Sequence, residues 1–246
     1  PTVVELTADA QDLADDLVTH PERTKAVMRM MPHLTWTSIL LILASLALTV
    51  KGGVTPILLY SGLVIWAMAY SLRWIPKSWF GFSSPREMPL MKSLFPSFGF
   101  AVLETVFPAV YIGMPLTAAV GVMFLFVLLR VLINTNIFDT RDMKGDMEQG
   151  LKTIPVIFGP TATRNFLLLL NTLSAILIFY AAATGILPSV AHAMNLITIY
   201  GYYFILKMFD KRTDKDFICD VIFDSEAIVW ILLLFAGSLA LAQVPP

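Results

Sequence analysis

The sequence predicts an all-α, polytopic membrane helix bundle with about seven transmembrane helices, and three observations lead to this prediction. Hydrophobic residues make up 57% of the 246 positions and charged residues only 14%, where a soluble globular domain carries about 25% charged residues. Seven apolar runs reach or approach the ~20 residues that a helix needs to cross a bilayer. None of these runs alternates polar and apolar residues in the manner of a half-buried strand.

The apolar runs follow an acidic N-terminal segment, and one long polar connection divides them. We expect spans at residues 34–50, 54–74, 94–111, 114–133, 165–186, 190–208 and 227–243. Pro108 and Gly121 lie inside two of these runs, which spanning helices tolerate when their neighbours satisfy the backbone. We interpret the chain as a single membrane domain: a cytoplasmic acidic segment (1–33), the first four helices (34–133), a cytoplasmic Asp-rich loop (134–164) and the last three helices (165–246).

Positive charge is distributed unevenly over the two expected faces of this bundle. Of the 17 lysines and arginines, all except Lys51 lie in the N-terminal segment, in the connections on the same side of the membrane, or at the ends of the runs that adjoin those connections. The positive-inside rule therefore places the N-terminus and the Asp-rich loop in the cytoplasm and the C-terminus on the opposite side. The net charge of −1 excludes the basic surface that nucleic acid binding requires.

The Asp-rich loop carries Asp139, Asp142 and Asp146 at spacings of three and four residues. At about 100° per residue, a helix with these spacings places all three carboxylates on one face. Like charges on one face repel unless a cation lies among them, and Mg²⁺ prefers carboxylate oxygens and substrate phosphates. We therefore predict a magnesium site in this loop. The alternative is a solvated acidic loop between two membrane helices.

The N-terminal segment repeats the same carboxylate spacing with Asp9, Asp12 and Asp16. Both clusters fall on the predicted cytoplasmic face, so we expect them to form two sides of one site for a metal-bound diphosphate. An acidic amphipathic N-terminal helix would show the same spacing and stays open as the alternative.

Residues 138–159, FDTRDMKGDMEQGLKTIPVIFG, resemble the second Asp-rich motif of the UbiA superfamily of intramembrane prenyltransferases. The similarity includes the residues that follow the aspartates in that motif: Gly150, Lys152, Thr153, Ile154, Pro155 and Val156. The N-terminal aspartates are similar to the family's first motif, with Ala8 in place of its asparagine. The loop from Tyr70 through Arg73 and Lys77 is similar to the family's basic loop.

The resemblance implies transfer of a prenyl group from a prenyl diphosphate to a hydrophobic acceptor, aromatic or lipid-like, inside the lipid bilayer. It implies Mg²⁺ as the cofactor, held by Asp139, Asp142, Asp146, Asp9, Asp12 and Asp16. Asp142, Asp146 and Lys152 are expected to carry the ionisation of the diphosphate. The expected substrate-binding residues are Lys77, Arg73, Arg141, Asn134 and Arg130. Arg130 and Glu104 both lie in apolar runs, and pairing with each other is an open alternative for them.

Two departures from the family pattern favour a second hypothesis. Family members normally have nine spanning helices, whereas this sequence starts at the first motif and supplies the last seven; either a truncated or a naturally short form is expected. Together with Ala8, this difference indicates a catalytically inactive relative that serves as a structural subunit among other membrane subunits. A seven-helix transporter or receptor is a third reading, and it agrees less well because nearly all ionisable residues lie at the cytoplasmic edge.

Overall fold

The computed structural model describes residues 21–242, and over this range the regular structure is helical with no strand. The chain folds into two compact units. The first comprises Pro1–Met88 with Phe107–Met114, and the second Pro89–Val106 with Pro115–Pro246. The predicted all-α class is confirmed for the described residues.

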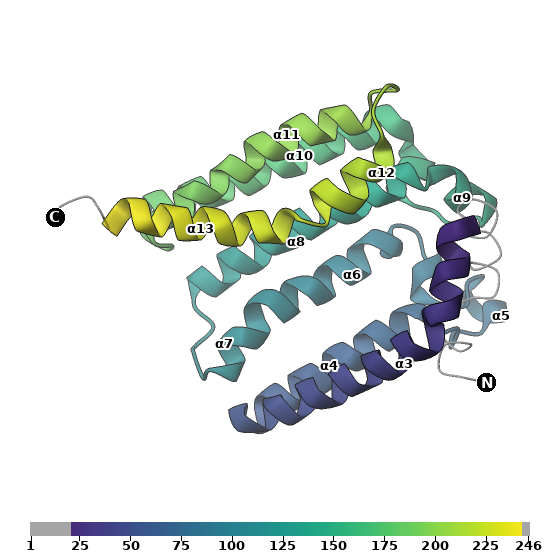
Figure 1. Ribbon diagram of the computed structural model, residues 1–246, viewed down its shortest axis with the longest axis horizontal. Helices are drawn as coiled ribbons and strands as arrows, with labels where there is room; N and C mark the ends of the chain where they lie inside the picture. The colour runs from purple at the N-terminus through teal and green to yellow at the C-terminus, as the bar shows by residue number, and fades with distance from the viewer. Residues whose placement is uncertain (1–20, 243–246) are drawn as a thin grey trace. The chain divides into compact units, whose positions relative to one another are not determined.

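The first unit is built around a pair of helices, α3 and α4, that pack along each other (Figure 1). Its elements are α3 (Pro21–Thr49), η1 (Val50–Gly52), α4 (Val54–Ser71), α5 (Lys77–Phe80), η2 (Pro85–Glu87) and α7 (Phe107–Tyr111). The short helix α7 closes this pair, since the Tyr111 hydroxyl donates to the Leu48 carbonyl at 3.3 Å. The rings of Tyr60 and Phe107 also lie 5.9 Å apart.

The second unit is organised around α8, which packs against α6 and against α10. Its elements are α6 (Met91–Ala101), η3 (Val102–Val106), α8 (Ala118–Arg141), α9 (Met143–Glu148), α10 (Ile154–Ala183), η4 (Ser189–Met194), α11 (Asn195–Met208), α12 (Lys215–Phe217), η5 (Ile218–Phe223) and α13 (Glu226–Ala242). Figure 1 shows α11 running along α10, and α13 packs against η4.

Buried apolar side chains hold α8 against α10 at two places along its length. One cluster surrounds Ile133, Ile137 and Leu167, and the other surrounds Phe126 and Ile178, all of which are almost completely buried. Helices in a bilayer gain little from hydrophobic burial against one another, so close packing of this kind supplies much of their association.

Four helical segments in the described part of the chain are long and apolar enough to cross a membrane: Met28–Gly52, Met91–Tyr111, Ala118–Arg141 and Ile154–Ala183. Val54–Tyr70 and Glu226–Leu239 are apolar helices of shorter length. The structure is therefore consistent with an integral membrane protein. The number of spans and their orientation stay predictions.

A kink near the start of α10 changes the direction of that helix. Gly159 has φ of +78° and ψ of 170°, a conformation that side chains other than glycine rarely adopt, and Pro160 follows it. The Thr163 hydroxyl donates to the Gly159 carbonyl at 2.8 Å, which links the kink to the first turn of the helix that follows it. The first turn, up to Phe158, is thereby separated from the long remainder of α10.

Candidate functional site

A buried cluster of charged side chains joins α6, α8 and α9 in the second unit. Lys92 Nζ lies 2.6 Å from Asp146 Oδ1 and 3.0 Å from Asp139 Oδ1. The Ser93 hydroxyl donates to the other oxygen of Asp139, Oδ2, at 2.6 Å. The side chains of Asp139 and Asp146 are each only 5% exposed. Two carboxylates from different helices therefore meet at one ammonium group.

The two carboxylates stand on either side of an interruption between α8 and α9. Helix α8 ends at Arg141, Asp142 adopts φ of −88° and ψ of 8°, and α9 begins at Met143. Asp142 turns toward Arg141, whose Nε donates to Asp142 Oδ1 at 2.8 Å. The structure shows contacts of Asp139 and Asp146 with Lys92 and of Asp142 with Arg141, and the expectation that all three aspartates share one face stays a prediction.

The backbone at the start of α6 places Lys92 in this cluster. Leu90 has φ of +65°. This φ lies in the left-handed region. A non-glycine residue in that conformation is strained by on the order of 1–3 kcal/mol, and such residues tend to occur at functional sites. The Leu90 N–H donates to the Lys152 carbonyl at 3.0 Å, which ties the start of α6 to the segment after α9. Lys92 then lies in the first turn of α6, where the helix dipole disfavours a cation, and the two carboxylates offset this cost.

Oxygen atoms with no hydrogen-bond donor remain at this cluster and on the helix beside it. Asp146 Oδ2 is buried and has no partner among the described residues, and neither has Asn136 Oδ1, one turn before Asp139 on α8. Burial raises the pKa of Asp146 above its ordinary value, although Lys92 acts in the opposite direction. Buried acceptors without donors cost free energy, so this place is suited to a further donor or a cation.

The donor chemistry of the cluster fits Mg²⁺ in part. Carboxylate oxygens are the ligands that Mg²⁺ prefers, and it is commonly bound by one or two carboxylates together with water and substrate phosphates. Asp139 and Asp146 match this pattern. No group of three or more His, Cys, Asp or Glu side chains arranged to hold a metal occurs in the described part of the chain.

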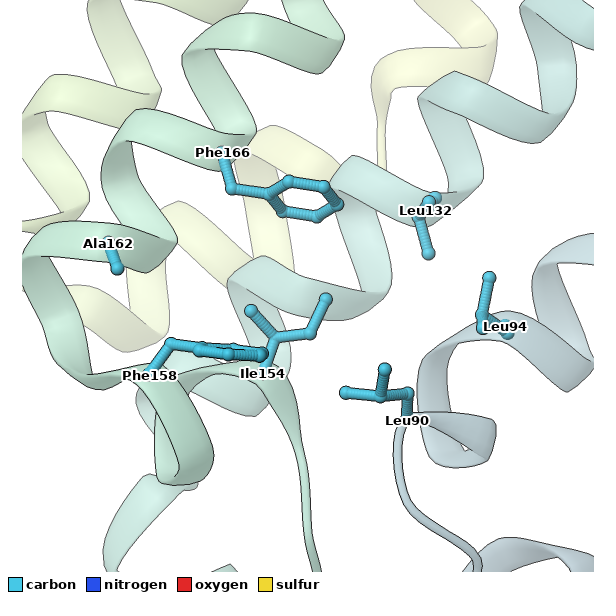
Figure 2. Close-up of a pocket in the computed structure, with 7 residues that line it drawn as sticks. All are labelled: Leu90, Leu94, Leu132, Ile154, Phe158, Ala162 and Phe166. Atoms are coloured by element: carbon cyan, nitrogen blue, oxygen red, sulfur yellow. The ribbon is translucent and has the colours of Figure 1, made fainter.

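An apolar pocket of about 390 Å³ lies in the same unit, and Figure 2 shows the side chains around it. It is lined by Leu90, Leu94, Leu132, Ile154, Phe158, Ala162 and Phe166. Its lining comes from both sides of the α10 kink at Gly159, because Phe158 precedes the kink and Ala162 follows it. The volume falls within the usual range for small-molecule pockets, roughly 300–1,000 Å³.

The pocket and the charged cluster share α6 and α8, whereas Asp146 lies on α9, which does not line the pocket. In the sequence Lys92 stands between Leu90 and Leu94, which line the pocket, and Asp139 follows Leu132 on α8. A ligand with an apolar chain and an anionic head could therefore be held by α6 and α8 at both of its ends.

The remaining predicted residues of the second unit have other partners. Arg141 Nη1 donates to Asp220 Oδ1 at 2.8 Å, in addition to the contact with Asp142. Asn134 donates to the Phe223 carbonyl at 3.0 Å. The Lys152 side chain is exposed, and the residue takes part in the site through its carbonyl. The structure thus brings Asp139 and Asp146 together and places Asp142, Arg141 and Asn134 in neighbouring contacts.

Arg130 belongs to a separate buried cluster. Its Nε lies 2.6 Å from Glu226 Oε1, its Nη1 donates to Asn171 Oδ1, and the Trp230 indole donates to the same Glu226 oxygen at 3.0 Å. The pairing with Glu104 that the sequence left open is not found, because Glu226 takes that position.

The other predicted residues lie in the first unit or outside the described residues. Arg73 is exposed, and its Nε lies 3.9 Å from Glu87 Oε1. Lys77 begins α5. Asp9, Asp12 and Asp16 lie outside the described residues, so their part in the site stays a prediction.

Sequence reasoning missed Lys92, Ser93 and Glu226. A lysine at the expected start of an apolar helix is a usable signal, because a cation is unfavourable there unless an acid lies nearby. A glutamate directly before the last apolar run is a weaker signal, because acidic residues are common at helix N-termini, where the helix dipole stabilises them.

Over the described residues these observations define an all-helical fold, consistent with an integral membrane protein, in which a buried carboxylate–lysine cluster and an apolar pocket share α6 and α8. Comparisons of the chain with protein-family models, with curated proteins and with solved structures find no match.

Proposed function

We propose that the protein transfers a prenyl group from a prenyl diphosphate to a hydrophobic acceptor, aromatic or lipid-like, with the aid of Mg²⁺. The observation that carries this proposal is the meeting of Asp139 of α8 and Asp146 of α9 at Lys92 of α6, since α6 and α8 also help to line an apolar pocket. The resemblance of residues 138–159 to the second UbiA motif supports the same reaction. The proposal includes a UbiA-like bundle of about seven spans, with the N-terminus and the Asp-rich loops cytoplasmic and the C-terminus on the opposite side.

In this proposal Asp139 and Asp146 hold Mg²⁺ through carboxylate oxygens, among them the unpartnered Oδ2 of Asp146. When bound, Mg²⁺ would neutralise charge that develops on the diphosphate leaving group. Lys152, exposed just after α9, would donate charge-assisted hydrogen bonds to phosphate oxygens. Asp142 would contribute to the reaction only indirectly, because its carboxylate holds Arg141 at the end of α8.

The pocket would hold the isoprenoid chain. In the transfer, the allylic C–O bond breaks, its electron pair leaves with the diphosphate, and the acceptor attacks the resulting cation and then loses a proton. A water molecule near that cation would capture it first, so the apolar lining from Leu132, Phe158 and Phe166 would protect the reaction by excluding water.

Binding of labelled prenyl diphosphates of several chain lengths to the purified protein tests this proposal. We expect binding that requires Mg²⁺ and that Ala162→Trp weakens, because the indole would fill the pocket. Leu169→Trp is the matched control, since Leu169 is exposed on the same helix and does not line the pocket. Equal binding of prenyl diphosphate by both variants would show that the pocket does not hold the isoprenoid chain.

A second candidate is a structural membrane subunit with no catalysis. The observation that favours it is that Lys92 already lies between the two carboxylates, as in a purely structural ionic contact. This candidate predicts a folded protein that binds no prenyl diphosphate with or without Mg²⁺.

A further inference from the structure

We infer that Lys92 is a positioning residue whose ammonium group holds Asp139 and Asp146 together until a divalent cation replaces it between them. The inference deepens the proposed function and rests on it for the identity of the cation. It concerns the state of the site before substrate arrives.

The geometry gives Lys92 the place that a bound cation would take. Its Nζ contacts one oxygen of each carboxylate, at 2.6 Å for Asp146 and 3.0 Å for Asp139. Both acids are buried, so their mutual repulsion is only weakly screened, and an uncompensated pair would be costly. One ammonium charge against two carboxylates leaves the cluster short of neutrality, and a divalent cation would supply the missing charge.

Three features make this ammonium group replaceable. Asp139 is held independently by the Ser93 hydroxyl, so it does not need Lys92 to keep its orientation. Asp146 Oδ2 is buried without a donor and offers a ligand atom that Lys92 does not use. The lysine side chain is a flexible four-carbon stem, here 16% exposed, and it starts from a helix N-terminus that disfavours its charge.

Exchange of the cations would couple metal binding to substrate binding. Once displaced, the Lys92 ammonium group becomes available to donate to phosphate oxygens that arrive with the divalent ion. A single side chain would thus stabilise the empty site and then contribute to the filled one.

The test compares Lys92→Met with the control Lys144→Met, a substitution at an exposed lysine of α9. Thermal unfolding in detergent is measured in EDTA and in Mg²⁺, and Mn²⁺ binding is measured by electron paramagnetic resonance without substrate. We expect Lys92→Met to unfold at lower temperature than the wild type in EDTA and to regain stability in Mg²⁺. Its Mn²⁺ affinity should rise about tenfold, as for a site that a competitor occupies about nine-tenths of the time.

Lys144→Met should behave as the wild type in each measurement. Mn²⁺ affinity that is unchanged or lower in Lys92→Met would overturn the inference, as would a loss of stability that Mg²⁺ does not restore. If Lys92→Met does not fold, Lys92→Arg decides instead. A guanidinium group can bind carboxylates through two hydrogen bonds, so we expect weaker Mn²⁺ binding than in the wild type, and equal or tighter binding would overturn the inference.

Failure of the proposed function has a different signature. If the wild-type protein binds no prenyl diphosphate but Mg²⁺ still restores the stability of Lys92→Met, the cation exchange is supported and the prenyltransferase function is refuted. If the wild-type protein binds prenyl diphosphate with Mg²⁺ but Lys92→Met gains no Mn²⁺ affinity, only the cation exchange is refuted.

Discussion

Arg130 and Glu226 form an ion pair inside the second unit, with 2.6 Å between Nε and Oε1 and side chains that are 1% and 4% exposed. The pair connects α8 to the first residue of α13, and Asn171 connects it to α10. Charges buried to this degree are stable only when they are paired and hydrogen bonded, because their desolvation is costly. The contact therefore fixes how three helices pack.

Removing one partner of this pair should be strongly destabilising. We expect Glu226→Ala to lower the free energy of unfolding by about 3–5 kcal/mol, because Arg130 would stay buried without a counter-charge. The double variant Arg130→Met with Glu226→Met should cost less than the sum of the single variants. Unfolding by SDS titration measures each difference. Lys207→Met, which removes an exposed contact to Asp210, is the control and should cost less than about 1 kcal/mol. Additive effects at Arg130 and Glu226 would contradict the pairing.

A side chain at Gly201 should disturb the same cluster from α11. A Cβ there would lie 2.5 Å from Asn171 Oδ1 and 3.3 Å from Arg130 Nη1. We expect Gly201→Ala to cost about 1–3 kcal/mol in the same titration, as overpacked interiors do. At Gly121 on α8 a Cβ would meet no atom within 4 Å. Gly121→Ala should therefore be neutral or stabilise by up to about 1 kcal/mol. Equal effects of the two substitutions would show that the Gly201 contact is not tight.

The kink in α10 should depend on Gly159. With φ of +78° and ψ of 170°, Gly159 lies in a region that essentially only glycine adopts, so an alanine there is strained by about 1–3 kcal/mol, and straightening the helix to relieve this would move Phe158 away from Ala162. Gly159→Ala should therefore lower stability and weaken ligand binding in the pocket. Gly145→Ala in α9 is the control for stability, since its backbone has no positive φ and a Cβ meets no atom within 4 Å. A Gly159→Ala protein as stable as the wild type would contradict a required kink.

The Cys219 thiol should be unreactive in the folded protein. Cys219 is completely buried, and burial raises its pKa to about 12, so the thiolate is scarce near neutral pH. Maleimide labelling should be slow in mild detergent and fast after SDS unfolding. The unfolded chain releases this proton at lower pH than the folded protein, so the thiol's contribution to stability declines as pH rises from 9.0 toward about 12. Rapid labelling of folded protein would contradict this burial.

The helical class was predictable because a spanning helix leaves its signal in composition alone. The approach of Asp146 to Asp139 was also expected from spacing, although the structure achieves it through a break at Asp142 that a uniform helical angle does not describe. The contacts Lys92–Asp146 and Arg130–Glu226 join residues 54 and 96 positions apart. No local pattern specifies such partners, because they depend on which helices pack together.

The most direct test of the central claim is Mg²⁺-dependent binding of a labelled prenyl diphosphate to wild-type protein and to Asp146→Asn. The account predicts saturable binding by the wild type, loss of that binding in EDTA, and a large reduction in Asp146→Asn. Asp210→Asn, at an exposed carboxylate, should bind as the wild type does. A folded wild-type protein that binds no prenyl diphosphate, or an Asp146→Asn variant that binds it equally well, would contradict the account.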